Sequence, residues 1–145
     1  MEKVTFEEIV ESVIARDPRY GPGAYAFVRE ALDFTQRRTS SETADEVERH
    51  VSGQQLLVGI RDFALENYGP MASDLFQEWG IRRCEDFGEI VFNLIESQVL
   101  RKTKTDSRED FRGGYDFDET FRDPFLPASR VAELRRSQPP QPEQA

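Results

Sequence analysis

The chain has 145 residues, a mass of 16.8 kDa and a formal charge of −9, which results from 28 acidic and 19 basic side chains. This length suits one ordinary domain, and the apolar residues (37%) supply one modest core. The single cysteine excludes a disulfide scaffold, the short apolar runs exclude a membrane-spanning protein, and the acidic balance disfavours a general nucleic-acid binder.

Two amphipathic helices are predicted at the N-terminus. Thr5 and Glu8 have the Thr-x-x-Glu spacing of a capping box, and apolar residues then recur on one helical face. Pro18 ends this first helix, because the residue before a proline disfavours the helical region. A second helix with an apolar stripe is predicted over about residues 24–37.

Three further helices are predicted before residue 100, over residues 53–68, 70–79 and 85–100. Ser52 and Gln55 form a second capping-box pattern ahead of the first of them, and Gly80 ends the second. The third is the most apolar. Phe92 lies on the opposite side from its other large apolar residues, so we expect this helix to be covered on two sides.

The pattern changes after Leu100. Phe111, Tyr115 and Phe117 surround a pair of glycines, which predicts a weak β-hairpin or an ordered loop over residues 100–117. Three helices followed by a two-stranded flap are the element order of a winged helix, so residues 52–118 are compatible with a winged-helix-like core beneath an N-terminal two-helix layer. The predicted fold class is therefore mainly α, with five or six short helices and a small β-hairpin.

The predicted domain organisation is simple. Residues 1–127 are expected to form a single helical domain, and residues 128–145 a flexible tail rich in proline and glutamine. The N-terminus has neither the basic start nor the apolar run of a signal peptide, which predicts a cytoplasmic protein.

Several strings carry a family resemblance: HVSGQQLLVGIRD at 50–62, GPMA at 69–72, WGIRR at 79–83, EDFGEIVFNLIE at 85–96 and KTKTDSREDF at 102–111. Together they resemble an uncharacterised family of small bacterial cytoplasmic proteins found in planctomycetes and verrucomicrobia. The resemblance extends over roughly residues 4–121 and leaves the tail outside. It implies a bacterial cytoplasmic origin, and it brings no activity, ligand or catalytic residue.

Two side chains were considered as reactive groups. His50 is the only histidine, and no serine or cysteine stands near it at a spacing typical of a nucleophile pair, so a surface histidine at a helix end is expected. Cys84 precedes a helix N-terminus, where the helix dipole favours a thiolate, but the acidic residues after it oppose this, so a buried, inert thiol is expected.

Metal and cofactor sites are also not indicated. One cysteine and one histidine fall short of the four ligands of a structural zinc ion. The acidic cluster consists of Glu109, Asp110, Asp116, Asp118 and Glu119. Its surroundings do not match the ligand spacing of a calcium loop, and interleaved arginines favour ion pairing instead. We therefore predict no catalytic, cofactor-binding or metal-binding residue.

Two candidate interaction surfaces remain. The first is an aromatic set: Phe111, Tyr115, Phe117 and Phe121. It would either pin the C-terminal segment over the helices as core, or form an aromatic patch rimmed by charge, which is the composition of a protein-binding site. The core interpretation is favoured, because aromatic side chains dominate burial in small domains.

The second candidate surface is a basic patch: Arg82, Arg83, Arg101, Lys102 and Lys104. The helix that would enter a DNA groove, residues 85–100, has mainly acidic charged positions, which disfavours groove reading. The first functional hypothesis is therefore a non-catalytic protein–protein interaction module or regulatory adaptor with an unknown protein partner. The alternative is a winged-helix-like, nucleic-acid-associated regulator that uses the basic segment 101–104. An enzyme that uses the acidic segment is a third hypothesis.

Overall fold

The structure is a computed structural model that describes residues 4–39, 50–100 and 107–127. Five α-helices and four short helical turns make up this part of the chain: α1 (Phe6–Arg16), α2 (Pro22–Thr39), α3 (Gly53–Tyr68), the 3-10 turn η1 (Gly69–Met71), α4 (Ala72–Trp79), α5 (Cys84–Glu96), the 3-10 turn η2 (Arg108–Phe111), the π-helical turn η3 (Asp118–Arg122) and the 3-10 turn η4 (Asp123–Phe125). The predicted mainly helical class is confirmed. None of the described helices is both long and apolar enough to span a membrane.

Local capping interactions fix several helix ends, as the sequence predicts. The Thr5 Oγ1 atom accepts the backbone N–H of Glu8 at 3.2 Å, which starts α1. At the start of α3 the Ser52 hydroxyl accepts the N–H of Gln55 at 3.1 Å, and the Gln55 side chain accepts the N–H of Ser52 at 2.8 Å. Gly80 ends α4 with a φ of 84°, which is the left-handed region that favours glycine.

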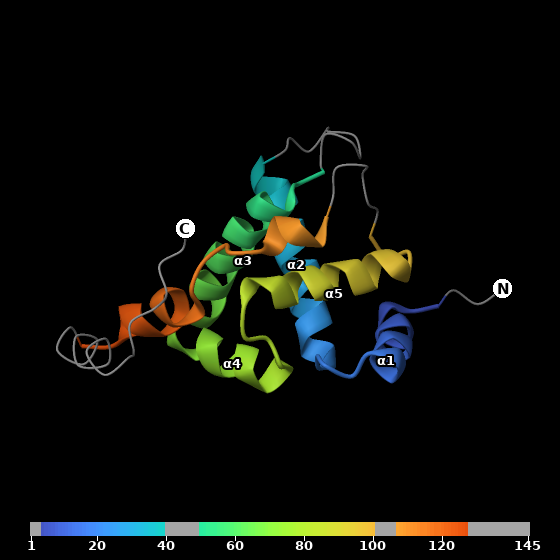
Figure 1. The fold of residues 1–145 in the computed structure, drawn as a ribbon, viewed down its shortest axis with the longest axis horizontal. Coiled ribbons are helices and arrows are strands. Elements are labelled where there is room, and N and C mark those ends of the chain that lie inside the picture. The colour runs from blue at the N-terminus through green and yellow to red at the C-terminus, as the bar shows by residue number, and fades with distance from the viewer. Residues whose placement is uncertain (1–3, 40–49, 101–106, 128–145) are drawn as a thin grey trace.

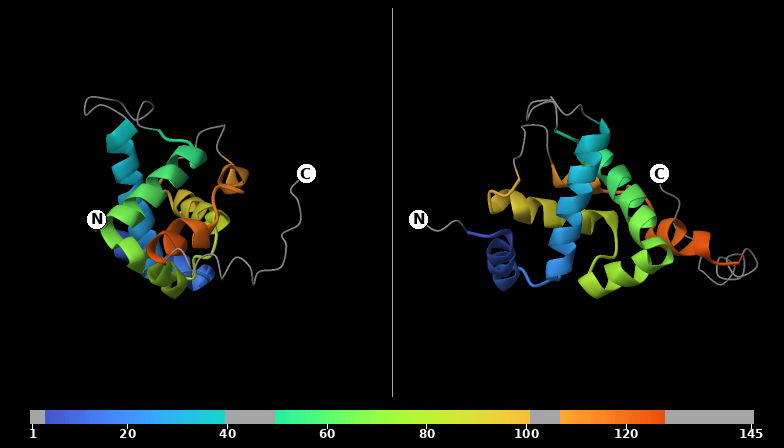
Figure 2. Two further views of the ribbon diagram at one scale, coloured as in Figure 1. Left: turned by 90° about the vertical axis from the view of Figure 1, so that its left-hand side faces the viewer. Right: turned by 180° about the vertical axis from the view of Figure 1, so that it is seen from behind.

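Helix α2 is the centre of the fold, since it packs against α1, α3, α4 and α5 (Figures 1 and 2). Helix α5 crosses α2, while α3 approaches it closely where Gly59 faces Thr35. A methyl group at Gly59 would overlap the Thr35 hydroxyl, so glycine is required at this crossing. The same hydroxyl donates to the carbonyl of Ala31 at 2.7 Å, which satisfies a fully buried polar group.

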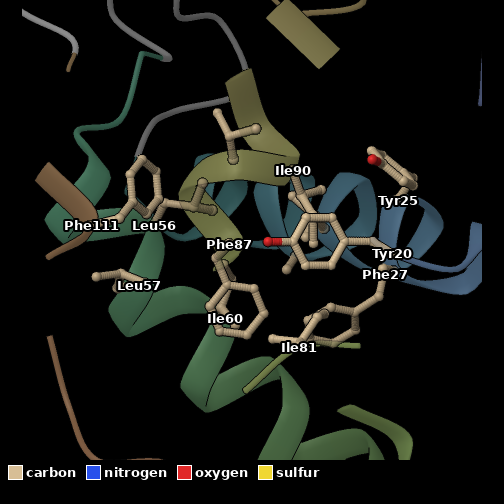
Figure 3. Close-up of a cluster of buried hydrophobic side chains, with 14 of the residues drawn as sticks. Tyr20, Tyr25, Phe27, Leu56, Leu57, Ile60, Ile81, Phe87, Ile90 and Phe111 are labelled. Carbon is tan, nitrogen blue, oxygen red and sulfur yellow. The ribbon is translucent and has the colours of Figure 1, made fainter. Parts of the chain in front are cut away.

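The core contains many aromatic side chains. The Phe76 ring meets Phe121 edge-on at a centroid distance of 4.9 Å and Phe87 at 5.5 Å, and such edge contacts are favourable. Figure 3 shows side chains from α2, α3 and α5, together with Phe111 of η2, gathered in one buried cluster. The 107–127 segment therefore contributes to the same core as the helices.

A partly buried polar network ties the α1–α2 connection to α5. The Asn93 side-chain amide donates to Asp17 Oδ2 at 2.9 Å and to the Tyr25 hydroxyl at 3.0 Å. Arg19 donates two further hydrogen bonds to the Asp17 carboxylate, at 2.8 and 2.7 Å. These hydrogen bonds, of which that from Arg19 is the largest cause, hold the pKa of Asp17 well below its ordinary value.

The predicted β-hairpin is not found. Residues 107–127 contain no strand, and their backbone N–H groups bond locally: that of Asp110 to the Ser107 carbonyl, and those of Arg112 and Thr120 likewise within one turn. Phe111 and Phe121 of this segment are both buried in the core. A winged-helix core over 52–118 is thus unsupported. Residues 101–106, the remainder of the predicted hairpin, and the predicted tail at 128–145 lie outside the described residues.

Helix α5 ends earlier than the predicted residue 100. It stops at Glu96, and Gln98 then adopts a φ of 64°. The backbone N–H groups of Val99 and Leu100 both turn back to the carbonyl of Leu94, at 2.9 and 3.3 Å. Two apolar side chains expected to continue the helix therefore fold over its C-terminal end.

Candidate functional site

A cavity of about 360 Å³ lies where the C-terminal part of α2, the start of α3, helix α5 and η2 meet. Its floor is apolar and buried, and it is formed by Val51, Leu56, Val91, Phe92 and Phe111. This size and lining are typical of sites that bind a small molecule or a single large side chain.

The mouth of the cavity, formed by its more exposed lining residues, is mixed. Its polar members are Gln36 near the end of α2, His50 and Ser52 ahead of α3, and Ser107 and Asp110 at η2, and its partly exposed apolar members are Leu32, Ile95, Val99 and Leu100. The Asp110 Oδ2 atom accepts the backbone N–H of Ser107 at 3.0 Å, which fixes the orientation of this carboxylate. An apolar floor with a few oriented polar groups at its edge favours binding over chemistry.

Two glycines let η2 approach close enough to form one wall of the cavity. A Cβ atom at Gly53 would lie 2.6 Å from the Cβ of Asp110, and one at Gly88 would lie 2.9 Å from the ring of Phe111. In Figure 1, η2 lies over α5. Larger residues at either glycine would lift η2 and deform the cavity.

Ion pairs on one side of η2 hold it against α5. Arg108 pairs with Glu89 at 3.3 Å and with Glu96 at 3.5 Å, and its guanidinium lies 5.0 Å from the centre of the Phe92 ring. Glu96 also forms an ion pair with Arg16 of α1, at 3.0 Å. These exposed pairs position η2 and supply modest stabilisation.

The predicted aromatic set occupies the core and its edge. Phe111 and Phe121 are buried, whereas Tyr115 and Phe117 are partly buried against the core. Phe117 meets the Phe121 ring at 5.2 Å, and the Tyr115 hydroxyl donates to the Leu57 carbonyl at 2.9 Å. Because Phe111 and Phe121 are buried, the four side chains do not form one exposed patch, and Phe111 alone of the four lines the cavity.

The predicted basic patch is described only in part. Arg82 and Arg83 are exposed, and their backbone N–H groups donate to Asp86 Oδ2 at 2.8 and 3.2 Å. The Arg83 guanidinium lies 3.8 Å from the carboxylate of Glu85. The other three members, Arg101, Lys102 and Lys104, lie outside the described residues.

The two candidate reactive side chains are not brought together in the cavity. Cys84 is 1% exposed, its Sγ atom lies 3.5 Å from the Tyr115 carbonyl, and it does not line the cavity. Burial raises the pKa of this thiol to about 11, so it is a neutral group near pH 7. No group of three acidic, histidine or cysteine side chains placed to hold a metal ion occurs in the described ranges.

Sequence reasoning missed the residues that build this cavity. Gly53 and Gly88 were not singled out, although a glycine inside the most apolar helix is a signal of close approach by another segment, because glycine weakens a helix. Val91 and Leu100 fall within the apolar helix predicted over residues 85–100, and nothing in that pattern indicates a cavity.

Comparisons of the sequence with family models and with curated proteins, and of the fold with solved structures, found no match.

Proposed function

We propose that the protein is a non-catalytic protein-interaction module that takes one apolar side chain of a protein partner into the cavity between α2, α3, α5 and η2. The observation that carries this proposal is the form of the cavity, which has a buried apolar floor and a partly exposed mouth that contains both polar and apolar side chains. Protein interfaces have this anatomy, with an apolar anchor at the centre and polar groups around it.

The state of the reactive groups supports a binding role over catalysis. The only thiol is buried outside the cavity, and its raised pKa removes the thiolate that a nucleophile needs. His50 is at the mouth of the cavity, and no cysteine stands beside it there. The cavity therefore offers shape and hydrogen-bonding groups to a partner.

The alternative, a nucleic-acid-associated regulator, finds less support in the described geometry. Helix α5 carries four acidic residues and no basic one, which opposes contact with phosphates. The two described arginines of the basic patch stand beside Glu85 and Asp86. A regulator that uses residues 101–104 stays a hypothesis for a separate binding test.

Blocking the cavity tests the proposal. Gln36→Trp places a large side chain at the mouth from the partly exposed face of α2, and Gln77→Trp introduces the same change at an exposed position of α4 away from the cavity. Tagged wild-type protein and both variants are used to capture partners from a native lysate. Helix content is checked by circular dichroism.

We expect a stoichiometric partner of the wild-type protein. Gln77→Trp should bind this partner with unchanged affinity, and Gln36→Trp should bind it more than about tenfold more weakly. A partner that a folded Gln36→Trp variant binds as tightly as the wild type would overturn the proposed site. Absence of any partner that depends on the cavity would overturn the proposed function.

A further inference from the structure

We infer that residues 107–115 form a strap that opens away from α3 and α5 as a unit, and that the ion pairs of Arg108 hold it closed. The strap consists of Ser107, the turn η2 and the four residues that follow it. It supplies one wall of the cavity through Ser107, Asp110 and Phe111. Opening of the strap therefore changes access to the cavity, whichever ligand enters it.

Side chains alone join the strap to the helices by hydrogen bonds. In the described part of the chain, the backbone–backbone hydrogen bonds of the strap lie within η2 and its two capping residues. The Gly113 N–H donates to the Glu85 Oε1 atom at 3.3 Å, and the Tyr115 hydroxyl donates to the Leu57 carbonyl at 2.9 Å. Opening of the strap thus breaks no backbone hydrogen bond of a helix, and segments attached in this way open more easily than the whole domain.

The strap is a self-contained unit. Within it, the Ser107 N–H donates to Asp110 Oδ2 at 3.0 Å, and the Ser107 hydroxyl accepts the N–H of Glu109 at 3.2 Å. After the strap, the Thr120 N–H donates to the carbonyl of Asp116 at 3.1 Å, so Asp116 begins a separate, locally bonded turn. These two sets of local bonds place the boundary of the moving unit between residues 115 and 116.

Arg108 is the charged link between the strap and α5, over which η2 lies in Figure 1. Its guanidinium is shared by Glu89 and Glu96 and also lies over the Phe92 ring. Glu89 in addition pairs with Arg19 at 3.5 Å, so the link belongs to a network, which contributes more than an isolated exposed pair. The Arg108 side chain is about half exposed, so dissolved salt screens its ion pairs.

Phe111 supplies the apolar part of the attachment. Its ring is buried on the backbone surface at Gly88 and Gly53, and this burial favours the closed strap. Apolar burial changes little with moderate concentrations of NaCl, whereas the ion pairs of Arg108 are screened. The balance between the open and the closed strap should therefore shift towards the open form as ionic strength rises.

Cys84 is a natural reporter of the strap. Its Sγ atom lies 3.5 Å from the Tyr115 carbonyl, and a Cβ atom at Gly114 would lie 3.1 Å from the same sulfur. The residue is 1% exposed, so a reagent reaches the thiol only after an opening of the structure. Because the chain has a single cysteine, the labelling signal comes from this position alone.

The rate of alkylation by iodoacetamide at constant pH measures the opening of the full chain. Rates at about 50 mM and about 500 mM NaCl are divided by those of the urea-unfolded chain at the same salt concentration, which removes any direct effect of salt on the reagent. Low concentrations of urea then distinguish two routes, since opening of the strap exposes little surface and global unfolding exposes much. We expect a weak dependence on urea, and a slope equal to that of global unfolding would overturn the strap. No partner is needed, so the result is independent of the capture experiment.

The variant Arg108→Gln tests the role of the ion pairs. At the lower salt concentration it should be labelled about threefold faster than the wild type, and at the higher one the two rates should agree within about 1.5-fold. The matched control Arg37→Gln removes the same charge from an exposed pair with Asp33 on α2 and should be labelled at the wild-type rate. Circular dichroism confirms that both variants are folded. Equal rates for Arg108→Gln and the wild type at low salt, or a difference that persists at high salt, would overturn the inference.

Discussion

Gly59 of α3 lies directly against Thr35 of α2, so closely that no side-chain carbon fits between them. Thr35 is fully buried, and its hydroxyl is bonded to the Ala31 carbonyl. This contact sets the distance between α2 and α3 at their crossing.

Gly59→Ala is expected to destabilise the protein. The added methyl group would overlap the Thr35 hydroxyl, and such overpacking costs about 1–3 kcal/mol, which exceeds the gain in helix propensity from alanine. Urea unfolding measures the difference. In the control Gly21→Ala, the nearest atom would lie 3.9 Å from the new methyl group, so stability should change by less than about 0.5 kcal/mol. Equal midpoints for both variants would contradict the close approach.

Phe111→Ala is expected to cost about 3 kcal/mol of unfolding free energy, because the ring is 3% exposed and fills the space above Gly88. The substitution should also lower the affinity of any ligand of the cavity, because it removes part of the cavity floor. Phe125→Ala makes the same change at a ring that is 44% exposed and should cost less than about 1 kcal/mol. Chemical denaturation of both variants checks the ranking, and a smaller loss for Phe111→Ala would show that η2 is not part of the core.

Alkaline pH is expected to destabilise the protein through Cys84. Below pH 9 the thiol keeps its proton in both states, but between pH 9 and about 11 only the unfolded state releases it, so stability is lost as pH rises. The wild type should lose roughly 2 kcal/mol more over this window than Cys84→Ala does. Unfolding free energies at about pH 8 and about pH 10.5 measure this, and parallel losses would contradict burial of the thiol.

The tyrosines give an optical signal for the same transition. Burial raises the pKa of all four, Tyr20, Tyr25, Tyr68 and Tyr115, above the ordinary 10.0. Absorbance at tyrosinate wavelengths should therefore rise at a higher pH in the folded protein than in the urea-unfolded chain, while circular dichroism follows the helix content in parallel. A rise around pH 10 with the helix content intact would contradict their burial.

Asp17→Asn is expected to lower stability at neutral pH by about 1 kcal/mol, because the ionised carboxylate accepts hydrogen bonds from Arg19 and Asn93. Since the folded-state pKa lies below the ordinary 3.8, this stabilisation is present above pH 3.8 and is lost as the pH falls below it. The variant and the wild type should therefore converge in acid. Asp33→Asn, at an exposed ion pair, serves as a control with almost no effect at either pH.

The helices were predictable because their signals are local. Ser52 and Gln55 are three residues apart and mark the start of α3, and Gly80 marks the end of α4 by its own conformation. The predicted end of α5, residue 100, lies four residues beyond the observed end at Glu96, because the apolar Val99 and Leu100 continue the helical pattern although Gln98 leaves the helical region.

The cavity and the turns at 107–127 were not predictable by the same reasoning, because they depend on residues distant in sequence. The spacing of Phe111, Tyr115 and Phe117 is compatible with a strand as well as with the turns that are observed. What decides the outcome is that Gly53 and Gly88 leave room for η2 on two different helices. The residue pattern within one segment cannot predict how closely that segment packs against helices distant in sequence.

Glu96 has a role that reaches beyond the mouth of the cavity. It is the counterion of Arg16 in the first helix and of Arg108 in η2, so a single carboxylate joins the beginning of the described chain to the turn that walls the cavity. If binding in the cavity displaces η2, Arg108 moves with it and Glu96 keeps only Arg16 of these two partners. Occupation of the cavity would then be detectable at the far side of α5, as a change in the environment of α1.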